Sequence, residues 1–145
     1  MKKSEQAIVV EQVFDVSVLE LWKAITELDQ MKKWFFGNIE AFEAELGFET
    51  RFVVENEGRI FPHLWKITEV DPFRKITYNW RYEGYEGDSD VTFELFGSGE
   101  QSKLTLIHRV LEDFSTGIPE FSRESCESGW AYFIKQSLKE YLQSK

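Results

Sequence analysis

The chain has 145 residues, which suits one domain with an apolar core large enough to need no disulfide or metal for stability. Its formal net charge of −9 comes from 17 basic and 26 acidic residues, and this balance argues against a nucleic-acid or anionic-membrane partner. The single cysteine, Cys126, rules out an internal disulfide and fits a reducing compartment. No apolar stretch reaches the length of a signal peptide or a membrane span. We therefore expect one domain over residues 1–145, located in the cytoplasm.

The first part of the chain predicts a strand followed by two short helices. Residues 5–14 are rich in β-branched and aromatic side chains, which favour extended structure. Ser17 and Glu20 form a capping box, and apolar residues at helical spacing follow it. A second short helix is expected over residues 28–35, with Asp29 near its start.

The middle of the chain changes to a period of two, which predicts strands. Turn signals occur at residues 56–58 and 71–72, and Pro62 indicates a sheet edge or a bulge. Residues 83–90 are expected to form a polar, acidic loop. The expected strands cover residues 38–44, 48–55, 60–70, 75–82, 91–96 and 104–111.

The last segment returns to helical spacing. Pro119 is a natural first-turn residue. One apolar stripe then runs nearly to the C-terminus, over about 20 residues or more, through Trp130, Phe133, Ile134, Leu138, Tyr141 and Leu142. A run of strands between segregated helices predicts an α+β domain, with an antiparallel sheet of about seven strands covered by the long C-terminal helix.

Several local motifs occur in an order that resembles one known family. They are FDVS at 14–17, LWKAIT at 21–26, Trp34, ITEVDP at 67–72, ITYNW at 76–80, SDVT at 89–92, LTLIH at 104–108, and Gly129-Trp130 followed by Leu138 and Tyr141-Leu142. This pattern covers most of the chain and resembles the activator-of-heat-shock-protein-90-ATPase homologues. That family belongs to the START-like, helix-grip superfamily, which also includes polyketide cyclases and the birch-pollen allergen type.

The resemblance implies a helix-grip fold with a cavity between the C-terminal helix and the sheet. The sequence departs from the family pattern at three positions: Trp65 replaces a usual glycine, Cys126 a frequent histidine and Gln12 a frequent arginine. Trp65 adds bulk that could fill the cavity, and the other two change polar groups that could address a ligand.

Aromatic residues make up 16% of the chain, and they build either a bulky core or a cavity wall. Under the second interpretation the protein is a non-enzymatic module that binds a small hydrophobic ligand. Gly129 costs helix stability and implies either close packing against a strand or a gap left for a ligand. The candidate wall residues are Trp34, Phe52, Trp65, Trp80, Phe93, His108, Trp130 and Phe133.

Two other functions stay open. The family name implies stimulation of an ATPase chaperone, although the family's co-chaperones carry an additional N-terminal domain, for which 145 residues leave no room. Helix-grip relatives also include enzymes such as cyclases and hydrolases, but a shared fold does not establish a shared reaction.

The reactive residues do not form a convincing catalytic or metal-binding set. His63 and His108 lie on different predicted strands without metal-ligand spacing, so we expect no metal and no cofactor. Cys126 and His108 could be a nucleophile and its base, but a buried helical thiol facing a strand histidine is the simpler interpretation. His108 itself could be a polar group of the cavity or a histidine held by structural hydrogen bonds.

Overall fold

The computed structural model describes residues 1–145 and confirms the α+β class. Its strands are β1 (Ile8–Phe14), β2 (Glu49–Asn56), β3 (Arg59–Asp71), β4 (Lys75–Tyr82), β5 (Asp88–Ser98) and β6 (Gln101–Glu112). Its helical segments are α1 (Val18–Thr26), α2 (Leu28–Trp34), the 3₁₀ turn η1 (Pro119–Phe121), α3 (Arg123–Ala131), the π-helical segment η2 (Tyr132–Ser137) and α4 (Leu138–Gln143).

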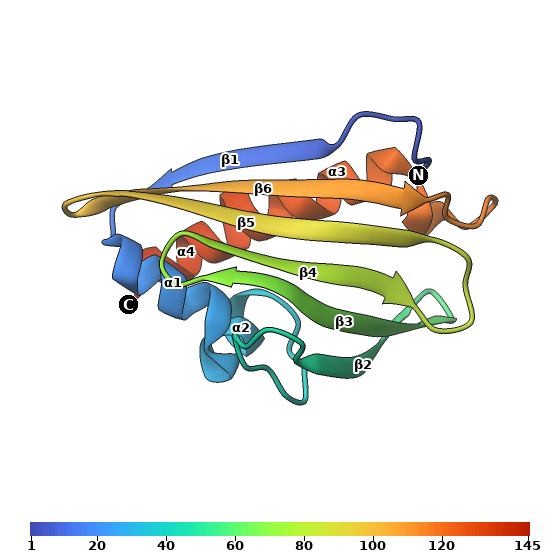
Figure 1. The fold of residues 1–145 in the computed structure, drawn as a ribbon, viewed down its shortest axis with the longest axis horizontal. Coiled ribbons are helices and arrows are strands. Elements are labelled where there is room, and N and C mark those ends of the chain that lie inside the picture. Colours follow the sequence, from blue (N-terminus) through green and yellow to red (C-terminus); the bar gives the residue numbers. More distant parts are fainter.

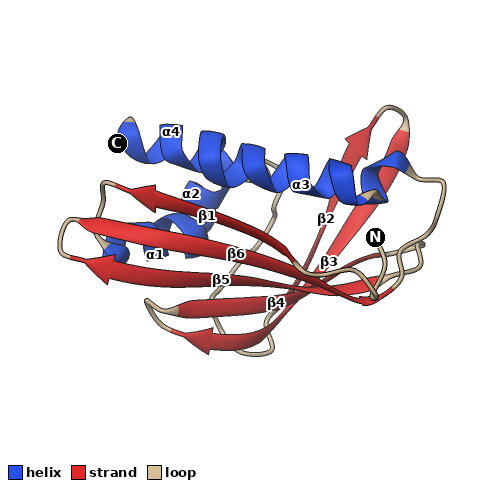
Figure 2. Cartoon of the chain, turned by 90° about the horizontal axis from the view of Figure 1, so that it is seen from above, coloured by secondary structure: helices blue, strands red, loops and turns tan.

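All six strands form one antiparallel sheet in the order β1-β6-β5-β4-β3-β2 (Figure 1). The sheet is strongly curved, and its β2–β3 end rises toward the N-terminal end of the long helix (Figure 2). All helices lie on the concave face, so this face is covered and the other is left to solvent. The sheet has six strands, close to the expected number of about seven.

The missing strand is the one expected over residues 38–44, and that expectation was wrong. This segment is a loop without strand pairing. Ile39 and Phe42 are buried at 0% and 7% exposure, and their spacing of three residues does not suit an alternating strand. The loop instead crosses the concave face, where the Asn38 amide donates to the carbonyl of Val53.

The helix starts follow local capping chemistry. The hydroxyl of Ser17 accepts from the backbone N–H of Glu20 at 3.3 Å, which confirms the expected start of α1. Ser122 does the same for Ser125 at 3.1 Å and starts α3 directly after η1. The Ser122 cap fixes where the long C-terminal helix begins above the sheet.

The expected long C-terminal helix is confirmed as one continuous run of α3, η2 and α4, with nine, six and six residues. Sequence periodicity did not indicate the π-helical segment in its middle. Such segments insert an extra residue into the helical repeat and occur often near functional sites. Ile134, Leu138 and Leu142 anchor the helix in the core, with exposures of 0%, 0% and 5%.

The core sits between the sheet and the helices, and aromatic rings dominate its β2–β4 side. Pairing places Trp65 opposite Trp80 and Phe52 opposite His63, so these rings face the helices in adjacent rows. Pro62 lies where β3 pairs only with β2, because pairing with β4 begins at His63, and the expected local edge is confirmed. None of the helices has the length and apolar character needed to cross a membrane.

Candidate functional site

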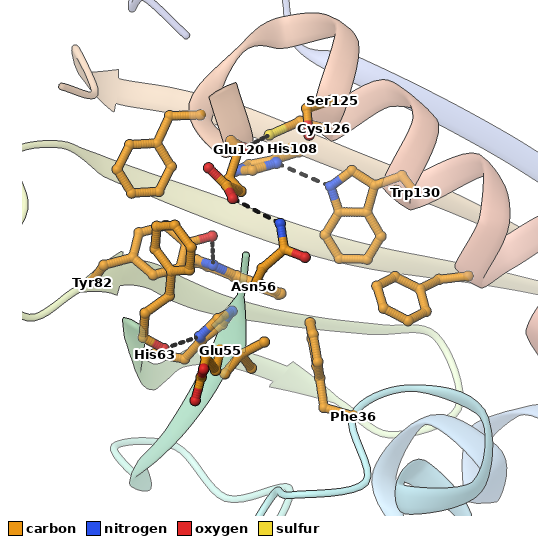
Figure 3. A pocket seen from close by; sticks show the side chains of 16 residues that line it. Phe36, Glu55, Asn56, His63, Tyr82, His108, Glu120, Ser125, Cys126 and Trp130 are labelled. Atoms are coloured by element: carbon orange, nitrogen blue, oxygen red, sulfur yellow. Dashed lines mark hydrogen bonds between the residues drawn. The ribbon is translucent and has the colours of Figure 1, made fainter. Parts of the chain in front are cut away.

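A cavity of about 410 Å³ lies between α3 and the raised β2–β3 end of the sheet. The sheet contributes its floor, η1 and α3 its roof, and Phe36 from the loop after α2 closes one side (Figure 3). Its wall contains nine aromatic or imidazole rings, namely Phe36, Phe61, His63, Trp80, Tyr82, His108, Phe121, Trp130 and Phe133. A cavity of this size and lining is typical of small-molecule sites.

Gly129 lies on the cavity wall and explains part of the space beneath α3. A Cβ atom placed on Gly129 would meet no other atom within 4 Å. The glycine is therefore not explained by close packing of the helix against a strand. The other interpretation of Gly129, a gap left beneath the helix, agrees with the structure. The neighbouring Trp130 points into the same region and is 5% exposed.

We expect Gly129→Ala to stabilise the protein by about 1 kcal/mol, because alanine favours the helix and its methyl group has free space here. The free energy of unfolding in a urea titration measures this effect. A loss of stability would show that the backbone at Gly129 cannot carry a side chain.

His108 is held in a chain of hydrogen bonds. The indole Nε1–H of Trp130 donates to its Nδ1 at 3.0 Å, so the neutral ring carries its proton on Nε2. That Nε2–H donates to the Ser89 hydroxyl at 3.0 Å, and Ser89 donates to the Trp80 carbonyl at 2.7 Å. Burial, with a smaller effect from the positive N-terminus, lowers the pKa of His108 to about 4. The ring is thus neutral, fully bonded and structural.

His63 occupies the opposite wall, on β3. Its Nδ1 lies 2.9 Å from the carbonyl oxygen of Phe61, and its ring stacks on Phe52 at a centroid distance of 4.7 Å. Burial lowers the pKa of His63 to about 4, although the bond to Phe61 acts in the opposite direction. His63 is therefore a neutral polar group in an aromatic surrounding.

The hypothetical nucleophile–base pair of Cys126 and His108 does not form. Both residues line the cavity, but the Cys126 thiol donates to the Glu120 carbonyl at 3.7 Å, and both nitrogens of His108 have other partners. Burial raises the pKa of Cys126 to about 11, so the sulfur is a thiol at neutral pH rather than the reactive thiolate. No group of three or more His, Cys, Asp or Glu residues lies close enough to hold a metal ion.

The rim of the cavity carries polar contacts that we call the Arg59–Glu120 latch, formed by Asn56, Arg59 and Glu120. The Arg59 guanidinium donates to the Glu120 carboxylate at 2.7, 2.8 and 3.0 Å, and the Asn56 amide donates to it at 2.7 Å. The Arg59 hydrogen bonds lower the pKa of Glu120 to about 2. The latch ties the tip of the β2–β3 hairpin to η1.

The structure brings four of the eight candidate residues to the cavity. Trp80, His108, Trp130 and Phe133 line it. The other four candidates do not line this cavity and are between 1% and 2% exposed within the main core: Trp34, Phe52, Trp65 and Phe93.

Trp65 does not fill the cavity, although its large side chain had made this one of the possibilities. Its ring packs one layer away, against Phe52 and Trp80 at centroid distances of 4.7 and 4.9 Å. Its indole Nε1 is buried without a hydrogen-bond partner. The space under α3 therefore exists beside Trp65 rather than in its place.

Sequence reasoning missed several residues of the site. The alternation Phe61, His63 and Trp65 along β3 places His63 on the helix-facing side, and this signal could have found it. Phe36 follows the end of α2 and belongs to no periodic element, so no pattern marks it. Glu120 acts through Arg59, 61 residues away in the sequence, and no local motif predicts that contact.

A curved antiparallel sheet gripped by a long C-terminal helix, with an apolar cavity between them, defines a helix-grip domain. Residues 15–143 match the family described as Activator of Hsp90 ATPase homolog 1-like protein. The chain belongs to this family, as the motifs of the sequence indicated. No protein with a curated description matches the chain.

Solved structures show the same fold. Protein CV1439 from Chromobacterium violaceum is 20% identical, with a TM-score of 0.77 over 95% of this chain and 97% of that one. The Aha1 dimer from Colwellia psychrerythraea is 20% identical, with a TM-score of 0.69 over 95% and 96% of the two chains. DynU16, from the dynemicin biosynthetic locus, is 23% identical with a TM-score of 0.75; the match covers 97% of this chain but only 48% of DynU16.

Proposed function

We propose that this protein binds a small, mostly apolar molecule in the cavity beneath α3, without transforming it. The observation that carries the proposal is the free space at Gly129, where a covering helix gives up a side chain above a wall of aromatic rings. A hollow of about 410 Å³ lined by aromatic rings lies within the size range of small-molecule sites.

The energetics favour an apolar occupant. Removing apolar surface from water contributes about 25 cal/mol per Å², less the cost of association. The ring-rich wall offers such surface on the sheet side and on the helix side. The Arg59–Glu120 latch supplies a polar rim, which is the usual arrangement around a small-molecule site.

A binding role also agrees better with the chemistry of the wall than catalysis does. His108 is committed to structural hydrogen bonds, and Cys126 is held as a thiol. Catalytic acids, bases and nucleophiles need pKa values near the working pH, and burial moves these two groups away from it.

Binding can be tested with a neutral apolar fluorophore, N-phenyl-1-naphthylamine, and a variant that fills the cavity. We expect saturable binding to the wild type and at least a roughly tenfold weaker affinity for Gly129→Leu, because the new side chain points into free space that the ligand needs. Ser128→Leu is the matched control: it adds the same side chain at the exposed neighbouring position. Equal binding by all three proteins would contradict the proposed site.

A chaperone-linked role is the second candidate, and the family description that names an Hsp90 ATPase activator favours it. It predicts that the purified protein raises the ATPase rate of Hsp90 and that Gly129→Leu leaves this effect unchanged, since the variant alters the inside of the cavity only. Stimulation together with an empty cavity would favour this role over ligand binding.

A further inference from the structure

His63 has one ring nitrogen that no residue uses. The carbonyl of Phe61 can only accept, so the 2.9 Å contact places the proton of the neutral ring on Nδ1. Nε2 is then a bare acceptor, and none of the chain's side-chain hydrogen bonds ends on it. His63 is 5% exposed and lines the cavity, and Figure 3 shows its second nitrogen turned away from Phe61 toward the interior.

This arrangement differs from that of His108. Both nitrogens of His108 are bonded, to Trp130 and to Ser89. Nε2 of His63 is not among the buried polar atoms that lack a partner, so it is open to the cavity and available to a molecule inside it. The pKa of His63, lowered to about 4 by burial, keeps the ring neutral at neutral pH and Nε2 ready to accept. A ligand that pairs with Nε2 must therefore offer a hydrogen-bond donor.

The surroundings of Nε2 restrict the shape of that partner. The His63 ring lies 5.2 Å from Phe36, 5.5 Å from Trp80 and 4.7 Å from Tyr82, measured between centroids and with tilted or edge-on geometry. Such rings leave flat spaces between them and favour aromatic neighbours over branched aliphatic ones. A donor that reaches Nε2 is thus expected on a planar ring system.

The hydroxyl of Tyr82 indicates that the donor on the ligand is itself a hydroxyl group. Its oxygen accepts from the Trp80 indole N–H at 2.9 Å, and no residue accepts its own proton. A hydroxyl on the ligand can donate to His63 and accept from a neighbouring O–H, whereas an ammonium can only donate. The cavity wall contains no Lys or Arg, so it also lacks a charge that would favour an anion.

We propose that the cavity recognises a neutral aromatic compound that carries a phenol-like hydroxyl, and that this hydroxyl donates a hydrogen bond to Nε2 of His63. The inference rests on the proposed binding function and specifies the class of ligand for the same cavity. His63 is then the residue that selects and orients the ligand, while the aromatic rings provide most of the contact surface.

Two probes of similar size separate the hydroxyl from the ring system: 2-naphthol and 2-methylnaphthalene. We expect wild type to bind 2-naphthol roughly three- to tenfold more tightly, which is the usual gain from one neutral hydrogen bond. In His63→Phe, which keeps a ring but loses the acceptor, the preference should disappear while 2-methylnaphthalene still binds. In Glu127→Gln, an exposed change on α3 outside the cavity, the preference should remain.

The nitrogen chemical shift of His63 gives a second readout that needs no variant. Adding 2-naphthol to ¹⁵N-labelled wild type should move the Nε2 resonance upfield, and 2-methylnaphthalene should leave it nearly unchanged. If both probes bind equally and Nε2 does not respond, the hydroxyl inference is wrong and the binding function stands. If neither probe binds, the proposed function fails as well. A preference kept in His63→Phe would show that the ligand's hydroxyl pairs with another group and would overturn the inference.

Discussion

Replacing Trp130 with alanine should lower the free energy of unfolding by about 3–5 kcal/mol, the usual cost of removing a large buried aromatic side chain. Trp130 is 5% exposed and packs against Phe35 and Trp80 at centroid distances of 5.8 and 5.5 Å. Its loss would also leave Nδ1 of His108 without a donor. Urea denaturation followed by circular dichroism measures the change.

Tyr132→Ala provides the matched control for Trp130. Tyr132 is an aromatic residue two positions further along the same helix, but it is 52% exposed. Its removal should change the stability by only about 0.5 kcal/mol, as for other surface positions. Similar losses for the two variants would mean that the helix is rotated relative to the sheet. Trp130→Phe retains a ring and isolates the hydrogen bond to His108, which is worth about 1–3 kcal/mol if its loss leaves the imidazole unpaired.

Stability should also fall steeply as the pH drops below about 6.5. Burial lowers the pKa of His63 and His108 to about 4 in the folded protein, from the ordinary histidine value of 6.5. Between these values the unfolded chain binds protons that the folded chain does not, so acid favours unfolding. Above pH 6.5 both histidines are neutral in the folded and unfolded chains, so they do not reduce the free energy of unfolding. Below pH 6.5 each histidine lowers the free energy of unfolding by up to about 1.4 kcal/mol per pH unit. By pH 4 the loss is roughly 3 kcal/mol for each.

Denaturation at pH 7.5 and pH 5.0 tests this dependence. The carboxylate of Glu120, with its pKa lowered to about 2, contributes stability that is lost only as the pH falls below 4.5, so it does not interfere in this window. His63→Phe should reduce the difference between the two pH values by about half, because one of two equivalent titrations is gone. Equal stability of wild type at both pH values would show that the buried rings take up protons freely.

Much of the fold was predictable because local chemistry and periodicity specify it. Ser17 caps α1, the alternating segments pair as strands, and the stripe that includes Ile134 and Leu138 lies in the core. The expected strand at residues 38–44 failed because this segment's apolar residues serve the core from a loop. The π-helical segment was not predicted because a single inserted residue hardly disturbs a pattern of i, i+3 and i+4.

Only half of the candidate residues predicted from the sequence line the cavity. Large aromatic residues on inward positions were recognised, but ring size does not tell whether a residue faces a cavity or a packed layer. Trp80 and Trp65 are paired across adjacent strands, yet only Trp80 lines the cavity. The difference depends on the curvature of the sheet and on the side chain absent at Gly129, and both are properties of the whole fold.

The burial along the C-terminal helix is uneven, and this bears on how the domain moves. In α3 only Trp130 is buried, whereas η2 and α4 place Ile134, Leu138 and Leu142 in the core. Local opening costs least where few apolar contacts are broken. We therefore expect the first turns of the helix to open before the rest, once the contacts of Glu120, Phe121 and Arg123 release. Under the proposed binding function, we expect the exchange rate of the ligand to follow the local opening of α3 rather than unfolding of the whole domain.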